Sequence, residues 1–313
     1  MTRRVLVTGA AGFIGSHLCR RLVADGDQVV ALDDLSEGSL DNLAGLDEIR
    51  FVRADLHDAD AVLAAADGCR AIFHQGAKRS VPRSMEQPRL TTEVNVLGTM
   101  NVLLAAAEHG ARVVAASSSS VYGDQDTFPL VETMEPRPRS PYAASKLAGE
   151  IYAASFLRSH GVPCVSLRYF NAYGPGQDPA SEYATVVPRF VVACLTGARP
   201  IVHGDGEQSR DFTYIDDVVE ANLRAADAPD AAQGRAFNIG GGGEPTTINR
   251  VLRIVADEIG VQPEPVHEPT RPGDVRKTQA DVSAAASLFG YEPKVPIEDG
   301  LRRTVDSFRE AAS

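Results

Sequence analysis

The sequence contains no tryptophan, and aromatic residues make up only 6% of its 313 residues. Its four cysteines, Cys19, Cys69, Cys164 and Cys194, form no C-x-x-C pair. Scattered thiols argue against a disulfide framework and favour a reducing compartment. No apolar run approaches the roughly 20 residues of a membrane span, and no secretory signal pattern precedes the first apolar segment. We therefore expect a cytoplasmic protein with no membrane partner and no bound metal.

An excess of positive charge is also absent. The 31 lysines and arginines face 42 acidic residues, which gives a formal charge of −11 and a pI near 5.1. This balance argues against nucleic acid as a partner, although an acidic protein can still hold a local basic pocket. Hydrophobic residues at 43% and charged residues at 23% are ordinary for a globular protein and exclude disordered, collagen-like and coiled-coil classes.

The first half of the chain alternates short apolar segments with helical patterns. Strands are predicted at Arg4–Thr8, Val29–Leu32, Phe51–Val52, Ala71–His74, Arg112–Ala116 and Val165–Arg168. Helices are predicted around Ile14–Val23, at Ala61–Ala66, at Leu90–His109 before Gly110, and at Tyr142–His160 before Gly161. This alternation is typical of βαβ units, so the predicted fold class is α/β, with a doubly wound parallel (Rossmann) sheet.

After Phe170 prolines and glycines become frequent, and the predicted helices and strands become shorter. We interpret residues 1–170 as the Rossmann domain and residues 171–205 and 244–313 as a smaller, discontinuous α/β lobe that binds the substrate. A segment at about 206–243 is predicted to return to the first domain, because Ala236–Ile239 has the pattern of a strand of the main sheet.

A glycine-rich turn follows the first predicted strand. Gly9, Gly12 and Gly15 have the spacing G-x-x-G-x-x-G, between that strand and a helix. Glycines there permit a tight turn and close approach to a pyrophosphate, which the helix N-terminus attracts. Asp33 ends the second strand 18 residues after Gly15, where a carboxylate would accept the ribose hydroxyls of adenosine. Asp34 follows it with no arginine, which disfavours a 2′-phosphate, so the predicted cofactor is NAD.

Tyr142 and Lys146 are spaced i, i+4, on one face of a predicted helix. A neighbouring cation favours a phenolate and lowers the pKa of a tyrosine, which makes Tyr142 a candidate general base for a hydroxyl group. Ser117–Ser120 stand at the end of the fifth predicted strand, the edge of an open α/β sheet where ligands bind.

Together these features resemble the NAD-dependent epimerase/dehydratase family of extended short-chain dehydrogenases/reductases, and within it the UDP-hexose 4-epimerases. The resemblance covers nearly the whole chain. It is carried by residues 9–15, 33–36, 54–56, 73–77, 94–99, 117–123, 142–146, 168–176, 204–217 and 271–274.

The resemblance implies a role for particular residues. Ser118, Tyr142 and Lys146 are the implied catalytic residues, with Ser118 between the substrate O4 and the tyrosine. The implied cofactor residues are Gly9, Gly12, Phe13, Ile14, Gly15, Asp33, Asp34, Asp55, Leu56, Gln75, Ala77, Lys78, Asn95, Tyr142, Lys146 and Tyr169. Among them, Asp55 and Leu56 would flank the adenine, and Lys78 and Asn95 would lie near the nicotinamide or the sugar. The implied substrate residues are Lys78, Ser118, Ser119, Ser120, Asn171, Val187, Arg210, Arg271, Asp274 and Thr278. Arg210 and Arg271 would form a charge-assisted clamp on the diphosphate.

The residues after Ser118 indicate which reaction to expect. Relatives that dehydrate the sugar carry Asp-Glu there, and decarboxylating relatives usually have Glu at the second position, whereas this chain has Ser119 and Ser120. Without groups that divert a 4-keto intermediate, oxidation and re-reduction at C4 remain, and we expect 4-epimerisation of a UDP-sugar. A dehydratase or decarboxylase of the same family is the alternative.

The sugar is less well defined by the sequence. Thr278 occupies a position where, in this family, tyrosine restricts the pocket to plain hexoses, so a 2-acetamido group should fit. The expected order is UDP-GlcNAc/GalNAc, then UDP-glucose/galactose, then UDP-glucuronate, which Asn171 and Asp178 disfavour. Another nucleotide is an alternative to UDP.

Two other classes of protein share this fold. A regulator that only senses NAD would be expected to lack Tyr142 or Lys146, and a net reductase would need NADPH, which Asp33 disfavours. Relatives usually dimerise through the helices at about 90–109 and 142–160, which implies a homodimer joined by a four-helix bundle.

Overall fold

The computed structural model describes residues 3–179, 184–270 and 275–312. Its centre is a seven-stranded parallel sheet with the order β11-β6-β5-β4-β1-β2-β3. These strands are β1 (Arg4–Thr8), β2 (Gln28–Asp33), β3 (Arg50–Arg53), β4 (Ala71–His74), β5 (Arg112–Ser118), β6 (Cys164–Tyr169) and β11 (Arg235–Ile239). The chain begins inside the sheet and the strand order reverses between β1 and β4, so the predicted doubly wound α/β fold is confirmed.

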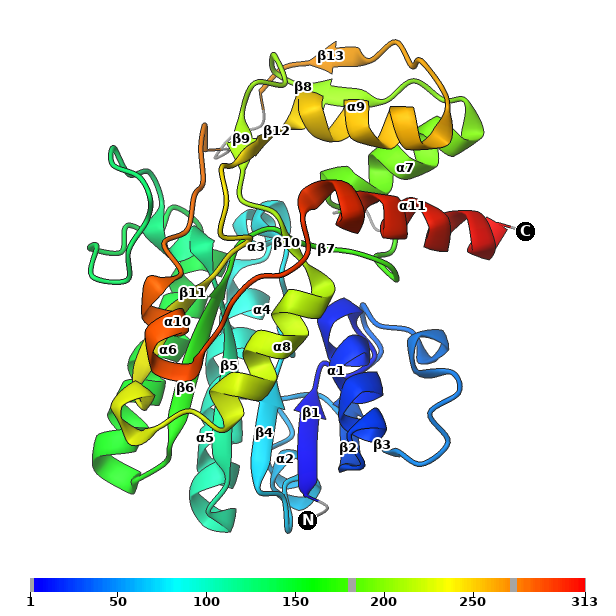
Figure 1. Cartoon of the computed structure of the whole chain (residues 1–313). Coiled ribbons are helices and arrows are strands. Elements are labelled where there is room, and N and C mark those ends of the chain that lie inside the picture. Colours follow the sequence, from blue (N-terminus) through cyan, green and yellow to red (C-terminus); the bar gives the residue numbers. More distant parts are fainter. Residues whose placement is uncertain (1–2, 180–183, 271–274, 313) are drawn as a thin grey trace.

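Helices cover both faces of this sheet (Figure 1). One face carries α1 (Phe13–Ala24) and α8 (Ile215–Ala226), and the other carries α2 (Ala59–Ala65), α5 (Gly98–His109) and α6 (Pro141–His160). Alternate residues of each strand face opposite layers, so Val5 and Val7 pack with α1, whereas Leu6 packs with α2 and α5. With both faces covered, the strands are nearly continuous apolar runs, which is the pattern that predicted them.

The helix predicted from Leu90 is interrupted. It consists of α4 (Pro88–Thr92), a π-helical turn at Glu93–Leu97 and α5. This 22-residue stretch contains an 18-residue window with a mean hydropathy of 1.2 and is long and apolar enough to cross a membrane by length and composition, which the sequence reading did not anticipate. Half of its most apolar window is buried inside the fold, as in a core helix packed against α2 and α6.

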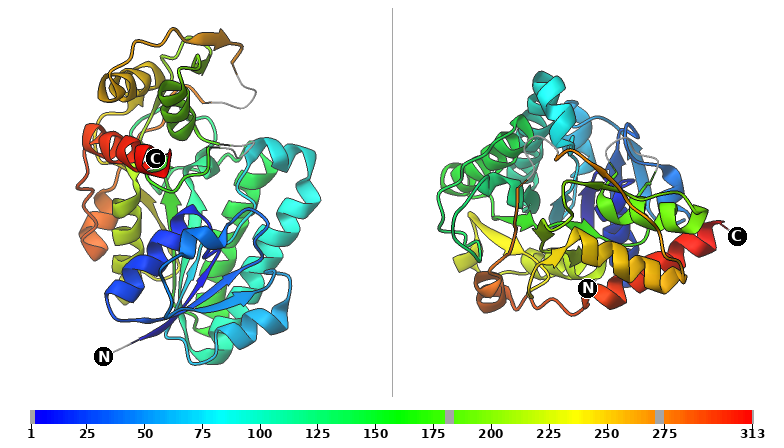
Figure 2. Two further views of the ribbon diagram at one scale, coloured as in Figure 1. Left: turned by 90° about the vertical axis from the view of Figure 1, so that its right-hand side faces the viewer. Right: turned by 90° about the horizontal axis from the view of Figure 1, so that it is seen from above.

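A second group of elements gathers above the carboxyl ends of the strands (Figures 1 and 2). They include α7 (Val186–Thr196), α9 (Ile248–Ile259) and α11 (Ile297–Ala312), which pack on one another, and β8 (Ile201–His203), which pairs with β13 (Val266–Glu268). Two short pairs join them to the sheet: β7 (Ala172–Tyr173) with β10 (Thr213–Tyr214), and β9 (Ser209–Arg210) with β12 (Thr246–Thr247). The other short helices are η1 (Leu40–Leu43), α3 (Val81–Glu86), η3 (Ser119–Tyr122), η4 (Asp230–Ala232) and α10 (Ser283–Phe289).

The strand predicted at Ala236–Ile239 does return to the main sheet, where β11 pairs in parallel with β6. α10 packs against β11, so part of the 244–313 segment lies beside the first domain rather than above it. The division into domains at residues 170, 205 and 243 stays a prediction.

Candidate active site

The first loop of the sheet has a geometry that only glycine permits. Gly9 has a φ of +65°, and a Cβ there would lie 2.6 Å from the backbone nitrogen of Gly76. A Cβ on Gly15 would lie 2.0 Å from the Gly9 carbonyl oxygen. The turn ends at Gly12, which precedes α1 and has no side chain to cap it. The first N–H groups of α1 are therefore available to an anion such as a pyrophosphate.

Asp33 is fixed at the end of β2 by two backbone hydrogen bonds. Its Oδ2 accepts from the Ala11 N–H at 2.9 Å, and its Oδ1 accepts from the Leu35 N–H at 2.8 Å. Burial raises the pKa of Asp33, and the two hydrogen bonds oppose that effect. The carboxylate thus joins the glycine turn to the loop after β2, and Asp33 lines the cavity that the two loops share.

A single cavity contains almost all of the residues predicted for the cofactor. It is lined by Gly9, Gly12, Phe13, Ile14, Gly15, Asp33, Asp34, Asp55, Leu56, Gln75, Ala77, Lys78, Tyr142, Lys146 and Tyr169. The lining combines the open N-terminus of α1, a carboxylate suited to a ribose, and an apolar Leu56 beside Asp55. These are the groups that a dinucleotide needs, so the residues present fit NAD.

Asn95 is absent from this cavity and has a supporting position. Its Oδ1 accepts from the Lys78 N–H at 2.7 Å, and its Nδ2 donates to the Lys78 carbonyl and to Ser145 Oγ. The π-helical turn carries Asn95, and π-turns are frequent at functional sites. Lys78 Nζ donates to Ser36 Oγ and lies 3.8 Å from Asp34, so its ammonium points to the loop after β2 rather than to Tyr142.

The catalytic pair lies in the first two turns of α6. Ser140 caps this helix by accepting from the Ala143 N–H, and Pro141 occupies its first turn, which starts the helix one residue earlier than predicted. Ser118, at the end of β5, lies near enough to the Tyr142 phenol to lower its pKa. Lys146 Nζ donates to the Ala116 carbonyl at 2.9 Å. The structure therefore brings the three predicted catalytic residues together across α6 and β5.

The protonation of this pair differs from the sequence expectation. Burial raises the pKa of Tyr142, against the lowering effects of the Ser118 hydrogen bond and of the positive charge of Arg79. Burial lowers the pKa of Lys146 to about 8.

A third residue of the same helix face completes the contact between α6 and β5. Glu150, one turn after Lys146, accepts from Ser117 Oγ. It also accepts from Arg168 on β6, through Nε at 2.9 Å and NH2 at 2.7 Å. Both side chains of this ion pair are at least nine-tenths buried. Two successive β5 residues, Ala116 and Ser117, are thus bonded to a stripe on α6.

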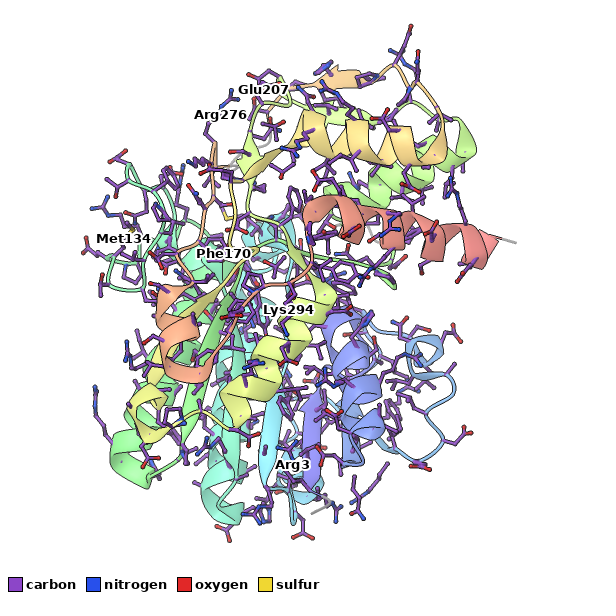
Figure 3. The ribbon with its side chains drawn as sticks, in the orientation of Figure 1. Arg3, Met134, Phe170, Glu207, Arg276 and Lys294 are labelled. Atoms are coloured by element: carbon purple, nitrogen blue, oxygen red, sulfur yellow. The ribbon has the colours of Figure 1, made fainter. Side chains whose placement is uncertain are left out.

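The predicted substrate residues divide between two places. Asn171, Val187 and Arg210 line a second cavity, and Asn171 follows Tyr169 of the first cavity by two residues, so the two cavities flank the end of β6. Phe170, between them, lies where the sheet meets the upper elements (Figure 3). Thr278 is buried and bonds the Asp211 N–H, outside the lining of both cavities.

The predicted serines form a hydrogen-bonded turn at the end of β5. Ser120 donates through its N–H and its hydroxyl to Ser118 Oγ, at 3.2 and 2.9 Å, within the turn that begins at Ser119. Arg271 and Asp274 lie outside the described residues. Within the part of the chain that the structure describes, no three His, Cys, Asp or Glu side chains gather as a metal site.

The sequence reading missed several residues of the cofactor cavity, among them Glu37, Gly38 and Arg79. Gly38 has a detectable reason to be there, because a Cβ would lie 2.8 Å from the Ala11 carbonyl carbon. Glu150 was missed too, although its i+4 spacing from Lys146 continues the Tyr142–Lys146 pattern and was the available signal.

Comparisons with known proteins agree with this geometry. Residues 5–240 match the model of the NAD dependent epimerase/dehydratase family. The chain is 42% identical over 312 residues to the UDP-glucose 4-epimerase of Mycolicibacterium smegmatis, covering 98% of each protein. Among solved structures it is similar to a UDP-glucose 4-epimerase from Thermotoga maritima with UDP-glucose (TM-score 0.94, 36% identity, 99% and 100% of the chains covered). It is equally similar to a UDP-N-acetylglucosamine 4-epimerase from Methanobrevibacter ruminantium in complex with UDP-N-acetylmuramic acid (TM-score 0.94, 36% identity, 99% of each chain).

The match covers well over half of the chain, and the glycine turn, Asp33 and the Tyr142–Lys146 pair lie inside it. The family and the cofactor expected from the sequence are therefore confirmed. The chain belongs to the NAD-dependent epimerase/dehydratase family and is an NAD-dependent enzyme of that family.

Proposed function

We propose that the protein is a UDP-sugar 4-epimerase that works through a 4-keto intermediate. The observation that carries this proposal is the placement of Tyr142 and Lys146 on the wall of the cofactor cavity, with Ser118 near enough to the phenol to lower its pKa. A phenol and a serine hydroxyl thus lie close together at the carboxyl end of β5, where an open α/β sheet binds its ligands. The three relatives described above, each of which is named as a 4-epimerase, support the same reaction.

Each catalytic residue has a role that its contacts suit. Tyr142 accepts the proton of the sugar O4 and later returns it, and Ser118 passes hydrogen bonds between O4 and the phenol. Lys146, bonded to the Ala116 carbonyl, supplies positive charge one helical turn away. NAD supplies the hydride acceptor that oxidises C4 and then re-reduces it. The net reaction consumes no cofactor, because the hydride returns to the opposite face of the same sugar.

Ser119 and Ser120 support epimerisation over dehydration or decarboxylation. The Ser120 hydroxyl is bonded to Ser118 Oγ at 2.9 Å, and neither serine can act as the acid or the base that those reactions require. At these two positions a 4-keto sugar would therefore meet no group that diverts it. Its remaining course is rotation about the diphosphate and reduction from the other face.

We propose two substrate pairs, UDP-GlcNAc/UDP-GalNAc and UDP-glucose/UDP-galactose. Thr278 supports the first pair through the family resemblance alone, because the structure places it outside the lining of both cavities. The relatives include a UDP-glucose and a UDP-N-acetylglucosamine 4-epimerase at the same 36% identity among solved structures, which supports both pairs. The second cavity, lined by Asn171, Val187 and Arg210, is the proposed nucleotide-sugar site. Arg271 and Asp274, which lie outside the described residues, stay proposed substrate residues through the family resemblance.

Proton NMR tests the proposal directly. The purified protein is incubated separately with UDP-GlcNAc, UDP-glucose and UDP-glucuronate, with and without added NAD, and the anomeric signals of the C4 epimers are followed. We expect epimers from the first two sugars, and loss of turnover by more than about a thousandfold in Tyr142→Phe with NAD still bound. No epimer from any sugar, or a Tyr142→Phe variant that keeps its activity, would contradict the proposed reaction.

We also propose that two copies of the chain form a homodimer in the cytoplasm. Leu97 and Leu104 on the α5 stretch and Ile151 on α6 are 46%, 47% and 62% exposed, although large apolar side chains are usually buried. Their exposure supports a four-helix bundle between two copies. The four cysteines are buried and free, which suits a reducing compartment.

A further inference from the structure

Three cations converge on the loop that follows β2, at the Asp33 end of the cofactor cavity. Lys78 and Arg79 come from the loop after β4, and Arg83 comes from α3. The sequence near Asp33 contains no arginine, so these cations reach it only through the fold. Lys78 and Arg79 line the cavity together with Asp33 and Asp34.

Cations at this place would favour NADP over NAD. NADP differs from NAD by a phosphate on the 2′ oxygen of the adenosine ribose, and dinucleotide sites that accept this phosphate use an arginine near the acid at the end of the second strand. Arginine is suited to the task because its planar fork matches a phosphate. By its cations alone, this site would attract NADP.

One carboxylate contacts all three of these cations. Glu37 Oε1 lies 2.9 Å from Arg83 NH1 and 3.8 Å from Lys78 Nζ, and Glu37 Oε2 lies 3.8 Å from Arg79 Nε. Its side chain is 28% exposed and lines the cavity. Since its partners come from two other segments, Glu37 is the point at which the loop after β2 is joined to the Lys78–Arg83 region.

The backbone around Glu37 is held in place. The next residue, Gly38, packs so closely on the glycine turn that a Cβ would meet the Ala11 oxygen at 2.8 Å. The Ser39 N–H donates to that same oxygen at 3.2 Å, and Asn42 Nδ2 donates to it at 2.8 Å. Glu37 is therefore presented to the cations from a loop anchored on both sides of Gly38.

We propose that Glu37 is the residue that makes the cofactor site selective against a 2′-phosphate. Its carboxylate accepts a hydrogen bond from Arg83 and offsets the nearby positive charges of Lys78 and Arg79, and its negative charge repels a phosphate that approaches them. Asp33 and Glu37 then act on different parts of the cofactor. Asp33 selects a free ribose hydroxyl, and Glu37 prevents the nearby cations from binding a 2′-phosphate. This inference concerns the cofactor and does not depend on which sugar is turned over.

The test measures binding rather than turnover. The full-length protein, freed of bound nucleotide, is titrated calorimetrically with NAD, NADP, 5′-ADP and 2′,5′-ADP, before and after Glu37→Gln. We expect the affinity of the variant for NADP and for 2′,5′-ADP to rise at least about tenfold, which equals 1.4 kcal/mol, while its affinity for NAD changes less than about threefold. Added salt should reduce the gain, because the new attraction is between charges.

Two further variants make the result specific. Glu86→Gln removes the same charge from an exposed residue on α3 that is not in the cavity lining, and it should leave all four affinities unchanged. In Glu37→Gln, adding Arg83→Ala should abolish most of the gain. A Glu37→Gln protein that still binds NAD but binds NADP no more tightly would overturn the proposal, as would an equal gain from Glu86→Gln. Should Glu37→Gln fail to fold, Glu37→Ser offers the same comparison with a smaller side chain.

Discussion

Removing the charge of Glu150 should destabilise the protein strongly, although this residue touches neither proposed ligand site directly. Glu150→Gln keeps the size of the side chain but replaces one acceptor oxygen with a donor that faces Arg168. One of the two hydrogen bonds to Arg168, at 2.9 and 2.7 Å, is lost, and the guanidinium keeps its charge in a buried place. Its NH1 already lacks a hydrogen-bond partner. Breaking a buried pair from one side costs about 3–5 kcal/mol, which is our expected loss of unfolding free energy.

Urea unfolding at equal protein concentration measures this loss. Asp299→Asn on α11 is the matched control, because it breaks an i, i+3 pair with Arg302 whose side chains are about half exposed. That pair should contribute at most about 1 kcal/mol. In a third variant, Glu150→Leu with Arg168→Met, no charge is left unpaired, so it should be more stable than Glu150→Gln alone.

The catalytic rate gives a second measurement on the same variants. Ser117, which donates to Glu150, precedes Ser118, so Glu150→Gln should lower kcat more than it raises KM for the UDP-sugar. If Glu150→Gln lowers the unfolding free energy no more than Asp299→Asn does, the ion pair does not stabilise the contact between α6 and β5, and the reasoning is refuted. An unchanged kcat in a destabilised variant would restrict the role of Glu150 to stability.

Three further predictions follow from the same geometry. Gly15→Ala should abolish NAD binding, because its Cβ would lie 2.0 Å from the Gly9 oxygen, whereas Gly243→Ala, with nothing within 4 Å, should bind NAD normally in the same titration. Leu104→Glu should convert the proposed dimer to a monomer in light scattering, and a monomeric wild type would contradict the bundle. Burial raises the pKa of Asp211 to about 6. The folded protein therefore binds a proton there at a pH where the unfolded chain, with its ordinary pKa near 3.8, does not. The unfolding free energy of the wild type minus that of Asp211→Asn should then grow as the pH falls from 7 to 5, by at most about 1.4 kcal/mol per pH unit. A difference that shrinks over this range would contradict the raised pKa of Asp211.

The main sheet could be predicted because its strands are buried on both faces and separated by helices of ordinary length. β1 and β4 have the residues that the apolar pattern indicated, and Gly110 and Gly161 end their helices with φ of 65° and 69°. The π-helical turn could not be predicted, because a 3.6-residue period continues through it. It depends on Asn95, which bonds the backbone of Lys78 and the side chain of Ser145, contacts made only after folding.

The site shows the same division between local and long-range information. The glycine turn, Asp33 and Tyr142 were found because short spacings and a family resemblance define them. The direction of the Lys78 side chain was not predicted, because the acids that attract it, Asp34 and Glu37, lie about 40 residues earlier in the chain. The raised pKa of Tyr142 was missed for a similar reason, because helical spacing alone does not reveal how deeply a side chain is buried.

The position of β11 at the edge of the sheet has a consequence for synthesis of the protein. All six residues of β6 are buried in the finished fold, but the strand that covers its outer edge, β11, is made more than 60 residues later. While the chain is still growing, β6 therefore offers open backbone N–H and C=O groups, and such an edge pairs readily with other chains. Fragments that end before Arg235 should aggregate, and the Rossmann part cannot be separated as an independent module by cutting after β6.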